Sequence, residues 1–418
     1  GSGRSLRPYF PVLCAMTMNR STDVRYVPFA RPSIGDAEIN AVTEVLRSGW
    51  LTTGAHATAF ESEFARFVGC RHALAVNSAT AGLHLALDAF NVGAGDTVIV
   101  PSFTFTATAE VARYRNAEVV FADCEHDGCM LDPEDVDRLA TRITRSGRRI
   151  GAIIPVHIAG EVADMARIRA IAARHDTVVI EDAAHAFPSK TVDGFAGTLG
   201  DAGVFSFYAN KTITTGEGGM LCTDSDSIAS RVRTMRLHGI DREAWSRYTD
   251  VNASWRYDIV AAGYKYNMPD TAAAIGRVQL RRAEEMLHAR RRIAERYTDA
   301  FRPLEDAGRL RLPHSTKEHA WHLYILRFVD PSIDRDRVAA ELNRAGIGVS
   351  VHYVPLHRTS FWSDRYPEQV DRLPNADRLY GEVLSLPLYP DLSQSDQDYV
   401  IGTVRDVVES ISMRTTDA

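Results

Sequence analysis

The chain has 418 residues, of which 45% are hydrophobic and 24% are charged, a composition that allows a large buried core divided between a large and a smaller domain. A net charge of −6 gives no support for binding to nucleic acid or to a membrane surface, and no apolar run approaches the ~20 residues that a transmembrane helix requires. The five cysteines lack the spacing of a metal site or a disulfide framework, which predicts no metal and a reducing, cytoplasmic location.

The first part of the chain alternates short Val/Ile-rich strands with amphipathic helices. Residues 1–26 are expected to form a flexible lead-in, and residues 1–3 look like a cloning remnant. The alternation is typical of βαβ units, so we predict an α/β domain over residues 27–285 with a mainly parallel sheet covered on both faces. The expected elements are a helix over 34–47, a strand over 72–77, a helix over 79–90, and strands over 97–100, 119–122, 150–156 and 178–181.

The last part of the chain predicts a smaller α+β domain over residues 286–418. A long arginine-rich helical stretch over 277–300 leads into it. The further expected elements are strands over 321–329 and 348–353 and helices over 335–345 and 397–410.

The candidate functional residues lie in loops that follow strands, where open α/β sheets place their ligands. Ser78, Ala79 and Thr80 stand at a strand-to-helix junction rich in small and hydroxyl residues. The free N–H groups and the dipole of such a helix N-terminus predict a phosphate site, although an ordinary helix cap gives the same pattern. Phe105 follows the expected strand over 97–100, and it either lies flat against a planar ligand or belongs to the core.

The expected strand over 178–181 brings acidic residues and a histidine to its carboxyl end. A buried carboxylate without a partner is costly, and Asp182 would find one in a ring-nitrogen cation, which it would keep protonated. His185 follows three residues later. Helix capping or a salt bridge is the structural alternative for Glu181 and Asp182.

Lys211 is one of only four lysines among 48 lysines and arginines. A lysine beside a glycine-rich turn, in a chain that otherwise uses arginine, indicates chemistry that needs a primary amine, although a solvated lysine is the simpler alternative. Ser206 precedes it and the turn Gly216–Gly219 follows it. Together with the phosphate junction and Asp182, these residues predict a site for pyridoxal 5′-phosphate (PLP) that binds covalently to Lys211.

From about residue 27 to its end the sequence resembles the nucleotide-sugar aminotransferases, the DegT–StrS group of fold-type I PLP enzymes. Several motifs in the right order carry the resemblance: Ser48–Gly54, Asn77–Thr80, Pro155–His157, Glu181–His185, Phe205–Phe207 with Lys211, Gly216–Gly219, Gly263–Asn267 and His352–His357. The resemblance implies a fold-type I transferase with a seven-stranded, mainly parallel sheet.

The resemblance also implies a role for each matching residue. Lys211 would bind PLP and shuttle protons, and Asp182 would pair with the pyridine nitrogen. Phe105 would stack on the ring and His185 would lie near the ring oxygen. The remaining implied contacts are the phosphate contacts of Ser78, Ala79, Thr80 and Ser206, the contact of Asn267 with the phosphate of the neighbouring subunit, and a position of His352 on the sugar–nucleotide side.

The activity implied is transamination of a nucleotide-linked keto sugar in a homodimer with shared active sites. L-Glutamate would give its amino group and leave as 2-oxoglutarate, and a TDP- or UDP-linked 4-keto sugar would accept it, for a secondary metabolite or a surface glycan. Amination at C3 stays open. A sugar 3-dehydratase of this fold would carry histidine in place of Lys211, and a non-catalytic regulatory homologue would be expected to have lost Lys211 or Asp182.

Overall fold

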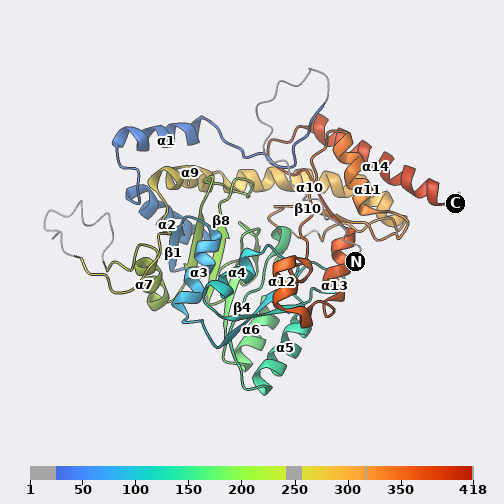
Figure 1. The fold of residues 1–418 in the computed structure, drawn as a ribbon. Coiled ribbons are helices and arrows are strands. Elements are labelled where there is room, and N and C mark those ends of the chain that lie inside the picture. The colour runs from blue at the N-terminus through green and yellow to red at the C-terminus, as the bar shows by residue number, and fades with distance from the viewer. Residues whose placement is uncertain (1–24, 242–256, 315, 317, 417–418) are drawn as a thin grey trace, which may run out of the picture.

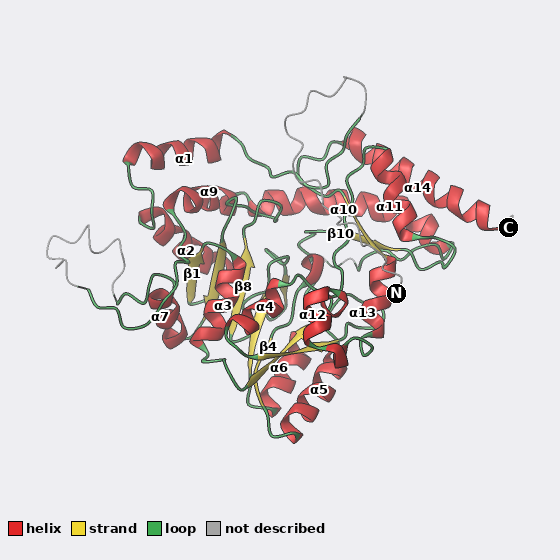
Figure 2. Cartoon of the chain, in the orientation of Figure 1, coloured by secondary structure: helices red, strands yellow, loops and turns green. Residues whose placement is uncertain are grey.

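The computed structural model describes residues 25–241, 257–314, 316 and 318–416, so residues 1–24 of the expected lead-in lie outside the described residues. Helices surround a central sheet, and a second group of helices lies beyond its upper edge (Figure 1). The strands run through the interior of the molecule and the helices lie outside them (Figure 2). The chain therefore has the layered α/β architecture that the alternating pattern predicts.

The central sheet has seven strands in the order β1-β9-β8-β5-β4-β2-β3. The pairs from β8 to β3 are parallel, whereas β9 is antiparallel to both of its neighbours. The predicted seven-stranded, mainly parallel α/β fold is confirmed. The strands are β1 (His72–Val76), β2 (Asp96–Pro101), β3 (Glu118–Ala122), β4 (Arg149–Ile153), β5 (Val178–Asp182), β8 (Ala202–Ser206) and β9 (Gly219–Thr223), and the short hairpin β6 (Lys190–Thr191) and β7 (Gly194–Phe195) lies between β5 and β8.

The strand register brings the loops of interest to one edge of the sheet. Gly219, the first residue of β9, pairs with Val76 at the end of β1 and with Ser206 at the end of β8. β8 runs parallel to β5, which ends at Asp182. Three segments that are far apart in the sequence therefore share one carboxyl edge, where ligands of open α/β sheets bind.

Helices cover the sheet and begin at residues suited to cap them. Asp132 caps α5 by accepting a hydrogen bond from the N–H of Glu134 at 2.9 Å, and Pro133 takes the first helical position. The helices of the large layer are α1 (Asp36–Ser48), α2 (Ala55–Val68), α3 (Ala79–Ala89), α4 (Ala107–Tyr114), α5 (Pro133–Arg145), the 3₁₀ turn η1 (Ile158–Gly160), α6 (Met165–Arg174), α7 (Asp226–Met235) and α9 (Asp270–Arg281).

The stretch over 277–300 is helical as predicted, but it belongs to two helices. α9 ends before Arg282 and α10 (Ala283–Asp306) begins after it. The guanidinium group of Arg282 donates to the carboxylate of Glu38 at 2.7 Å and to the carbonyl oxygen of Ser33 at 3.2 Å. These long-range contacts fix the residue at the junction, and nothing in the local sequence announces them.

A second hydrophobic core lies among α10, the antiparallel pair β10–β11 and the C-terminal helices. The strand predicted over 348–353 is wrong: the segment forms a single bridge between Ser350 and Ser385 and then turns toward the central sheet. The division into domains at residue 285 falls near the start of α10 and stays a prediction. The elements of this part are β10 (Tyr324–Arg327), α11 (Arg335–Arg344), η2 (Leu356–Arg358), α12 (Ser360–Arg365), η3 (Pro367–Gln369), α13 (Pro374–Glu382), β11 (Val383–Leu386) and α14 (Gln394–Thr416).

Among the helices within the described ranges, none is both long and apolar enough to cross a membrane.

Candidate active site

Lys211 lies in the turn between β8 and β9, close to the carboxyl edge of β5. Burial lowers the pKa of its amine to about 8, and the negative charge of Asp182 partly offsets this effect. Within the described residues its amine donates no hydrogen bond. The solvated-lysine alternative fails, because this amine is desolvated and has a carboxylate nearby.

Asp182 has a buried carboxylate with room for a further partner. One oxygen accepts a hydrogen bond from the hydroxyl of Thr108 on α4 at 2.8 Å, and the other accepts one from the N–H of Ala184 at 3.1 Å. Burial raises the pKa of the carboxyl, and these two bonds and the charge of Lys211 oppose that rise. A carboxylate with this environment is suited to hold a cationic ring nitrogen.

Glu181 points to the opposite face of the same strand, as successive residues of a strand do. Its carboxylate accepts hydrogen bonds from the Nε2–H of His157 at 2.8 Å and from the N–H of Gly197 at 2.7 Å. The N–H groups of Leu199 and Gly200 both donate to its other oxygen at 2.6 Å. The structural alternative, a salt bridge or a cap, therefore describes Glu181, which accepts four hydrogen bonds, whereas Asp182 accepts two and its functional role stays a prediction.

The N-terminus of α3 has the features expected of a phosphate cradle, the role predicted for Ser78, Ala79 and Thr80. Ser78 caps the helix, its hydroxyl accepting from the N–H of Ala81 at 3.1 Å. Within the described residues the N–H groups of Ala79 and Thr80 have no acceptor, so they remain available to anionic oxygens. Ser206 ends β8 close by, where its hydroxyl accepts from the N–H of Tyr208 at 3.3 Å.

Gly219 makes this close approach of three chain segments possible. A Cβ at this position would lie 2.7 Å from the carbonyl carbon of Ser78, 2.8 Å from the nitrogen of Ala79 and 2.9 Å from the oxygen of Phe205. Any larger residue would push the α3 N-terminus away from β8. The glycine, the capped helix, the desolvated amine and the open carboxylate together fit a phosphorylated cofactor that binds a lysine.

The expected aromatic partner is not a core residue. Phe105 is 58% exposed, so the alternative of a buried core phenylalanine is excluded. Its ring lies 6.2 Å from that of Tyr353, in a tilted arrangement. The predicted contact with a planar ligand is therefore the interpretation that remains for this residue.

Histidines and a tyrosine line the side of the site that faces the second core. His185 is buried, and its Nε2 lies 2.8 Å from the hydroxyl of Tyr353. His352 pairs through Nδ1 with the hydroxyl of Ser385 at 2.9 Å, and burial together with the charge of Lys211 lowers its pKa to about 3. His352 therefore stays neutral at ordinary pH. Tyr353 was not among the predicted site residues, although it lies in the motif His352–His357, because its segment was expected to form a strand.

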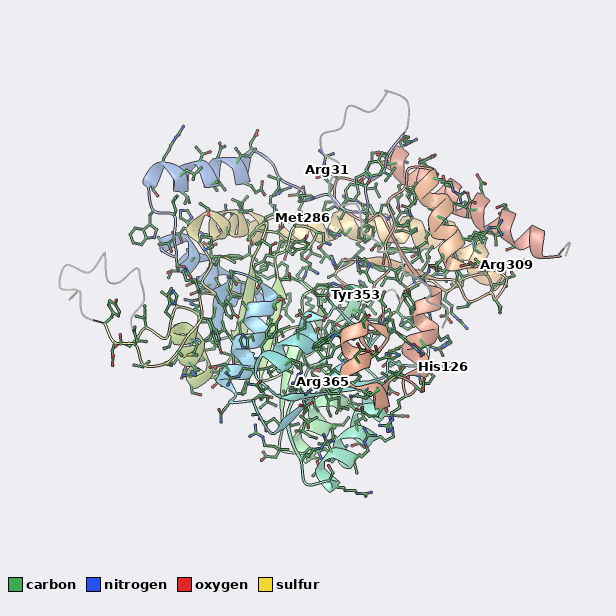
Figure 3. The ribbon with its side chains drawn as sticks, viewed as in Figure 1. Arg31, His126, Met286, Arg309, Tyr353 and Arg365 are labelled. Carbon is green, nitrogen blue, oxygen red and sulfur yellow. The ribbon has the colours of Figure 1, made fainter. Side chains whose placement is uncertain are left out.

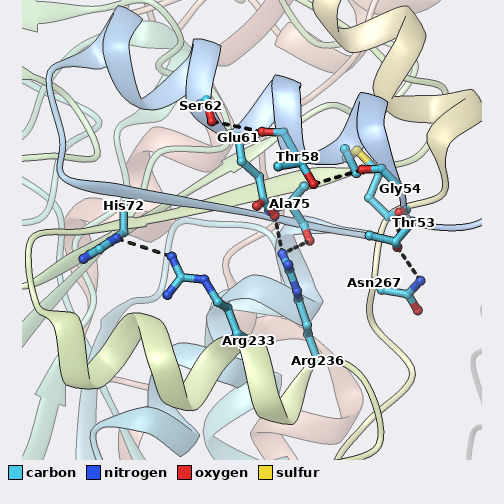
Figure 4. A network of polar contacts seen from close by, with 12 residues as sticks. Thr53, Gly54, Thr58, Glu61, Ser62, His72, Ala75, Arg233, Arg236 and Asn267 are labelled. Carbon is cyan, nitrogen blue, oxygen red and sulfur yellow. Dashed lines mark hydrogen bonds and ion pairs between the residues drawn. The ribbon is translucent and has the colours of Figure 1, made fainter. Parts of the chain in front are cut away.

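Asn267 lies next to the end of β1. It forms a bridge with Val76, and its side-chain amide donates to the hydroxyl of Thr53 at 2.7 Å (Figure 4). The amine of Lys265 donates to its side-chain oxygen. Thr53 and Lys265 are polar neighbours that were not among the predicted site residues.

Residues 32–405 match the family model described as the DegT/DnrJ/EryC1/StrS aminotransferase family. A Bacillus subtilis protein, named spore coat polysaccharide biosynthesis protein SpsC, is 42% identical over 389 residues, which make up 92% of this chain and 97% of that relative.

Two solved structures are similar over nearly their whole length. A putative sugar aminotransferase from Streptococcus pneumoniae in its PLP form is 32% identical with a TM-score of 0.83, covering 93% of this chain and 100% of that one. The aminotransferase TlmJ from Streptoalloteichus hindustanus is 33% identical with a TM-score of 0.82, again covering 93% and 100%.

Proposed function

This chain belongs to the DegT/DnrJ/EryC1/StrS aminotransferase family, and we propose that it aminates C4 of a TDP-linked 4-keto-6-deoxyhexose with L-glutamate as donor. It is a PLP-dependent sugar aminotransferase. The observation that carries the PLP chemistry is the placement of a desolvated lysine beside a carboxylate with two hydrogen bonds, next to free N–H groups at the start of α3. The C4 position, the TDP-linked sugar and the L-glutamate donor rest on the resemblance of the sequence motifs to those of 4-aminotransferases.

Each residue at the carboxyl edge takes one task in this proposal. PLP, when bound, supplies an electron sink for the carbanion formed on the donor. Lys211 binds the cofactor, and as a neutral amine it removes and returns the proton on the reacting carbon; its lowered pKa of about 8 makes the neutral form accessible near pH 8. Asp182 holds the ring nitrogen protonated, which favours withdrawal of electrons from that carbon.

The other predicted residues hold the cofactor and the sugar. The free N–H groups of Ala79 and Thr80 bind the phosphate, with the hydroxyls of Ser78 and Ser206 beside them. The ring of Phe105 covers the cofactor, and His185 stands on the side of its ring oxygen. His352, which burial keeps neutral, faces the sugar–nucleotide.

The proposed assembly is a cytoplasmic homodimer in which Asn267 reaches the phosphate of the neighbouring subunit. Coexpressed Lys211→Ala and Asn267→Ala subunits should then regain some activity as mixed dimers, because one of the two sites would have both residues intact. Mixed dimers that stay inactive after their composition is confirmed would overturn the shared site.

The name of a relative bears on what the product is used for. The 42% identical Bacillus subtilis protein is named for spore coat polysaccharide biosynthesis, which favours a surface glycan over a secondary metabolite.

The test is a product analysis. Purified protein is incubated with PLP, L-glutamate and TDP-4-keto-6-deoxyglucose, and the position of any new amine is determined by NMR. Lys211→Ala should form no product, whereas Lys190→Ala, which removes an exposed lysine, should leave turnover unchanged.

An amine at C4 supports the whole proposal. Conversion of the cofactor by glutamate without a sugar product would keep the donor and overturn the substrate, and 3-keto sugars and UDP-linked sugars would then be tested. An amine at C3 would overturn the proposed regiochemistry.

A further inference from the structure

A chain of hydrogen bonds at the edge of the active site has its direction fixed by a backbone amide. The N–H of Ala159 points to Nδ1 of His185 at 3.3 Å. A backbone amide can only donate, so Nδ1 is the acceptor and a neutral imidazole must carry its proton on Nε2. Burial and the positive charge of Lys211 lower the pKa of His185, which keeps the ring neutral.

The next bond in the chain runs from His185 to Tyr353. Since Nε2 carries the proton, it donates to the hydroxyl oxygen of Tyr353 at 2.8 Å. The hydroxyl proton of the tyrosine is then left for another acceptor, and within the described residues there is none. Burial and the negative charge of Asp182 raise the pKa of Tyr353, so the hydroxyl stays protonated.

The backbone that starts this chain is itself fixed. Ala159 has a φ of 59°, in the left-handed region that non-glycine residues seldom adopt. Its carbonyl oxygen accepts hydrogen bonds from the N–H groups of His322 at 2.9 Å and Leu323 at 3.2 Å. The ring of the buried His322 lies 4.4 Å from that of His185 and restrains it from the other side.

Tyr353 lies among residues that are predicted to contact the cofactor or the sugar–nucleotide. Figure 3 places Tyr353 near the middle of the molecule. Its ring lies 6.2 Å from that of Phe105 and 5.0 Å from that of His352. The titratable groups that act on Tyr353 and its partner are Asp182, His185, His352 and Lys211.

We propose that Tyr353 donates a hydrogen bond to the phenolic ring oxygen of bound PLP, and that His185 is a positioning residue which aims this hydroxyl. The inference rests on the proposed function, because it needs the cofactor at this edge of the sheet. It assigns the direct contact with the ring oxygen to a residue outside the predicted site.

The proposed hydrogen bond from Tyr353 to the ring oxygen can be detected in the visible absorbance of the bound cofactor. A donor to the anionic ring oxygen stabilises that oxygen most when the nitrogen joining Lys211 to the cofactor has lost its proton. Removal of the donor should therefore raise the pH at which this nitrogen titrates, by about one unit for one hydrogen bond to a charged acceptor. The visible absorbance of the lysine-bound cofactor reports that titration without any turnover.

The experiment compares the pH titration of PLP-loaded wild type, Tyr353→Phe, His185→Gln and His185→Leu. Tyr353→Phe should shift the midpoint upward by about one unit. His185→Gln can still accept from Ala159 and donate to Tyr353, so it should titrate like the wild type, whereas His185→Leu should shift part of the way. A 3-fluorotyrosine at position 353, a stronger donor of the same size, should shift the midpoint downward.

The possible results distinguish failure of the proposed function from failure of the inference about Tyr353. A wild type that forms no lysine-bound cofactor, as judged against Lys211→Ala, would overturn the proposed function and this inference with it. A normal wild-type spectrum with no shift in Tyr353→Phe would overturn the inference alone. If Tyr353→Phe does not fold, an unshifted midpoint in the fluorotyrosine protein overturns it instead.

Discussion

Strand β5 ends in two neighbouring carboxylates that lie in different surroundings. Glu181 accepts four hydrogen bonds, one from His157 and three from backbone N–H groups. Asp182 accepts two, from Thr108 and Ala184, and it faces Lys211. Both are almost inaccessible to water, so burial alone does not distinguish them.

The number of hydrogen-bond donors distinguishes the two acids. A buried carboxylate is stable when its lone pairs are occupied, and Glu181 meets this condition with residues of the chain alone. Asp182 accepts only two hydrogen bonds from the described residues, so its carboxylate has capacity left for a further partner. This difference predicts that changes at Glu181 act on stability and changes at Asp182 act on rate.

The largest effect is expected from Asp182→Asn. An amide of the same size cannot hold the ring nitrogen protonated, so the half-reaction with L-glutamate should slow on the order of a hundred- to a thousandfold. Stopped-flow absorbance of the PLP-loaded protein measures this rate. Asp193→Asn, at an exposed turn, is the matched control and should leave the rate unchanged. A near-normal rate in Asp182→Asn would show that another group keeps the ring nitrogen protonated.

Glu181→Gln should lower the stability of the protein and leave the rate nearly unchanged. Its NH₂ group would face backbone N–H donors, so about two charge-assisted hydrogen bonds are lost and the free energy of unfolding should fall by about 3 kcal/mol. Thermal and urea unfolding measure the loss, with exposed Glu44→Gln as the control. The half-reaction rate of the folded protein should change by less than about threefold, because no contact of Asp182 is removed. A large loss of rate with normal stability would erase the distinction between the two acids.

The sequence predicted the position of Asp182 better than the surroundings of Glu181. Val/Ile runs follow directly from burial between helix layers, so β2 to β5 could be placed. Asp182 was found because it follows the predicted strand over 178–181, and Lys211 because it is one of four lysines and lies beside a glycine-rich turn. The partners of Glu181 could not be found, since Gly197, Leu199 and Gly200 reach it only after the chain has folded back.

Tyr353 was missed for a similar physical reason. Its hydrogen bond to His185 spans 168 positions of the sequence, and it lies in a segment whose alternating pattern favoured a strand. The break between α9 and α10 also depends on distant residues, Glu38 and Ser33. Local sequence patterns predicted the layers of strands and helices. Long-range polar contacts determined the position of Tyr353 and the break between α9 and α10.

The titration of Lys211 tests the surroundings of Asp182, because the two groups interact. An amine with a pKa of about 8 is half neutral at pH 8, which is on the order of a hundredfold more neutral amine than in an ordinary lysine. Capture of PLP by the cofactor-free protein should therefore speed up as pH rises and level off just above pH 8. Stopped-flow absorbance across pH 6 to 10 gives the profile. A rate that keeps rising to pH 10 would indicate an unperturbed amine.

The smallest effect is expected from Thr108→Val, which removes one of the two donors to Asp182 and keeps the size of the side chain. In the wild type the hydrogen bond from Thr108 lowers the pKa of Asp182. Removing this bond therefore adds to the rise in pKa that burial already causes. A protonated Asp182 cannot hold a ring cation, and the rate is then lost on the acid side of the pH profile. We expect that limb to move up by about one pH unit, with roughly a tenfold slower half-reaction where the wild type is still fully active.

Thr104→Val is the control for this variant. Its hydroxyl lies 3.1 Å from that of Thr108 and does not touch Asp182, so its acid limb should move much less. An acid limb at the wild-type pH in Thr108→Val would mean that the hydrogen bond from Thr108 does not set the ionisation of Asp182. In that case the count of donors would not explain why the two carboxylates of β5 differ, and the charge of Lys211 would become the better explanation.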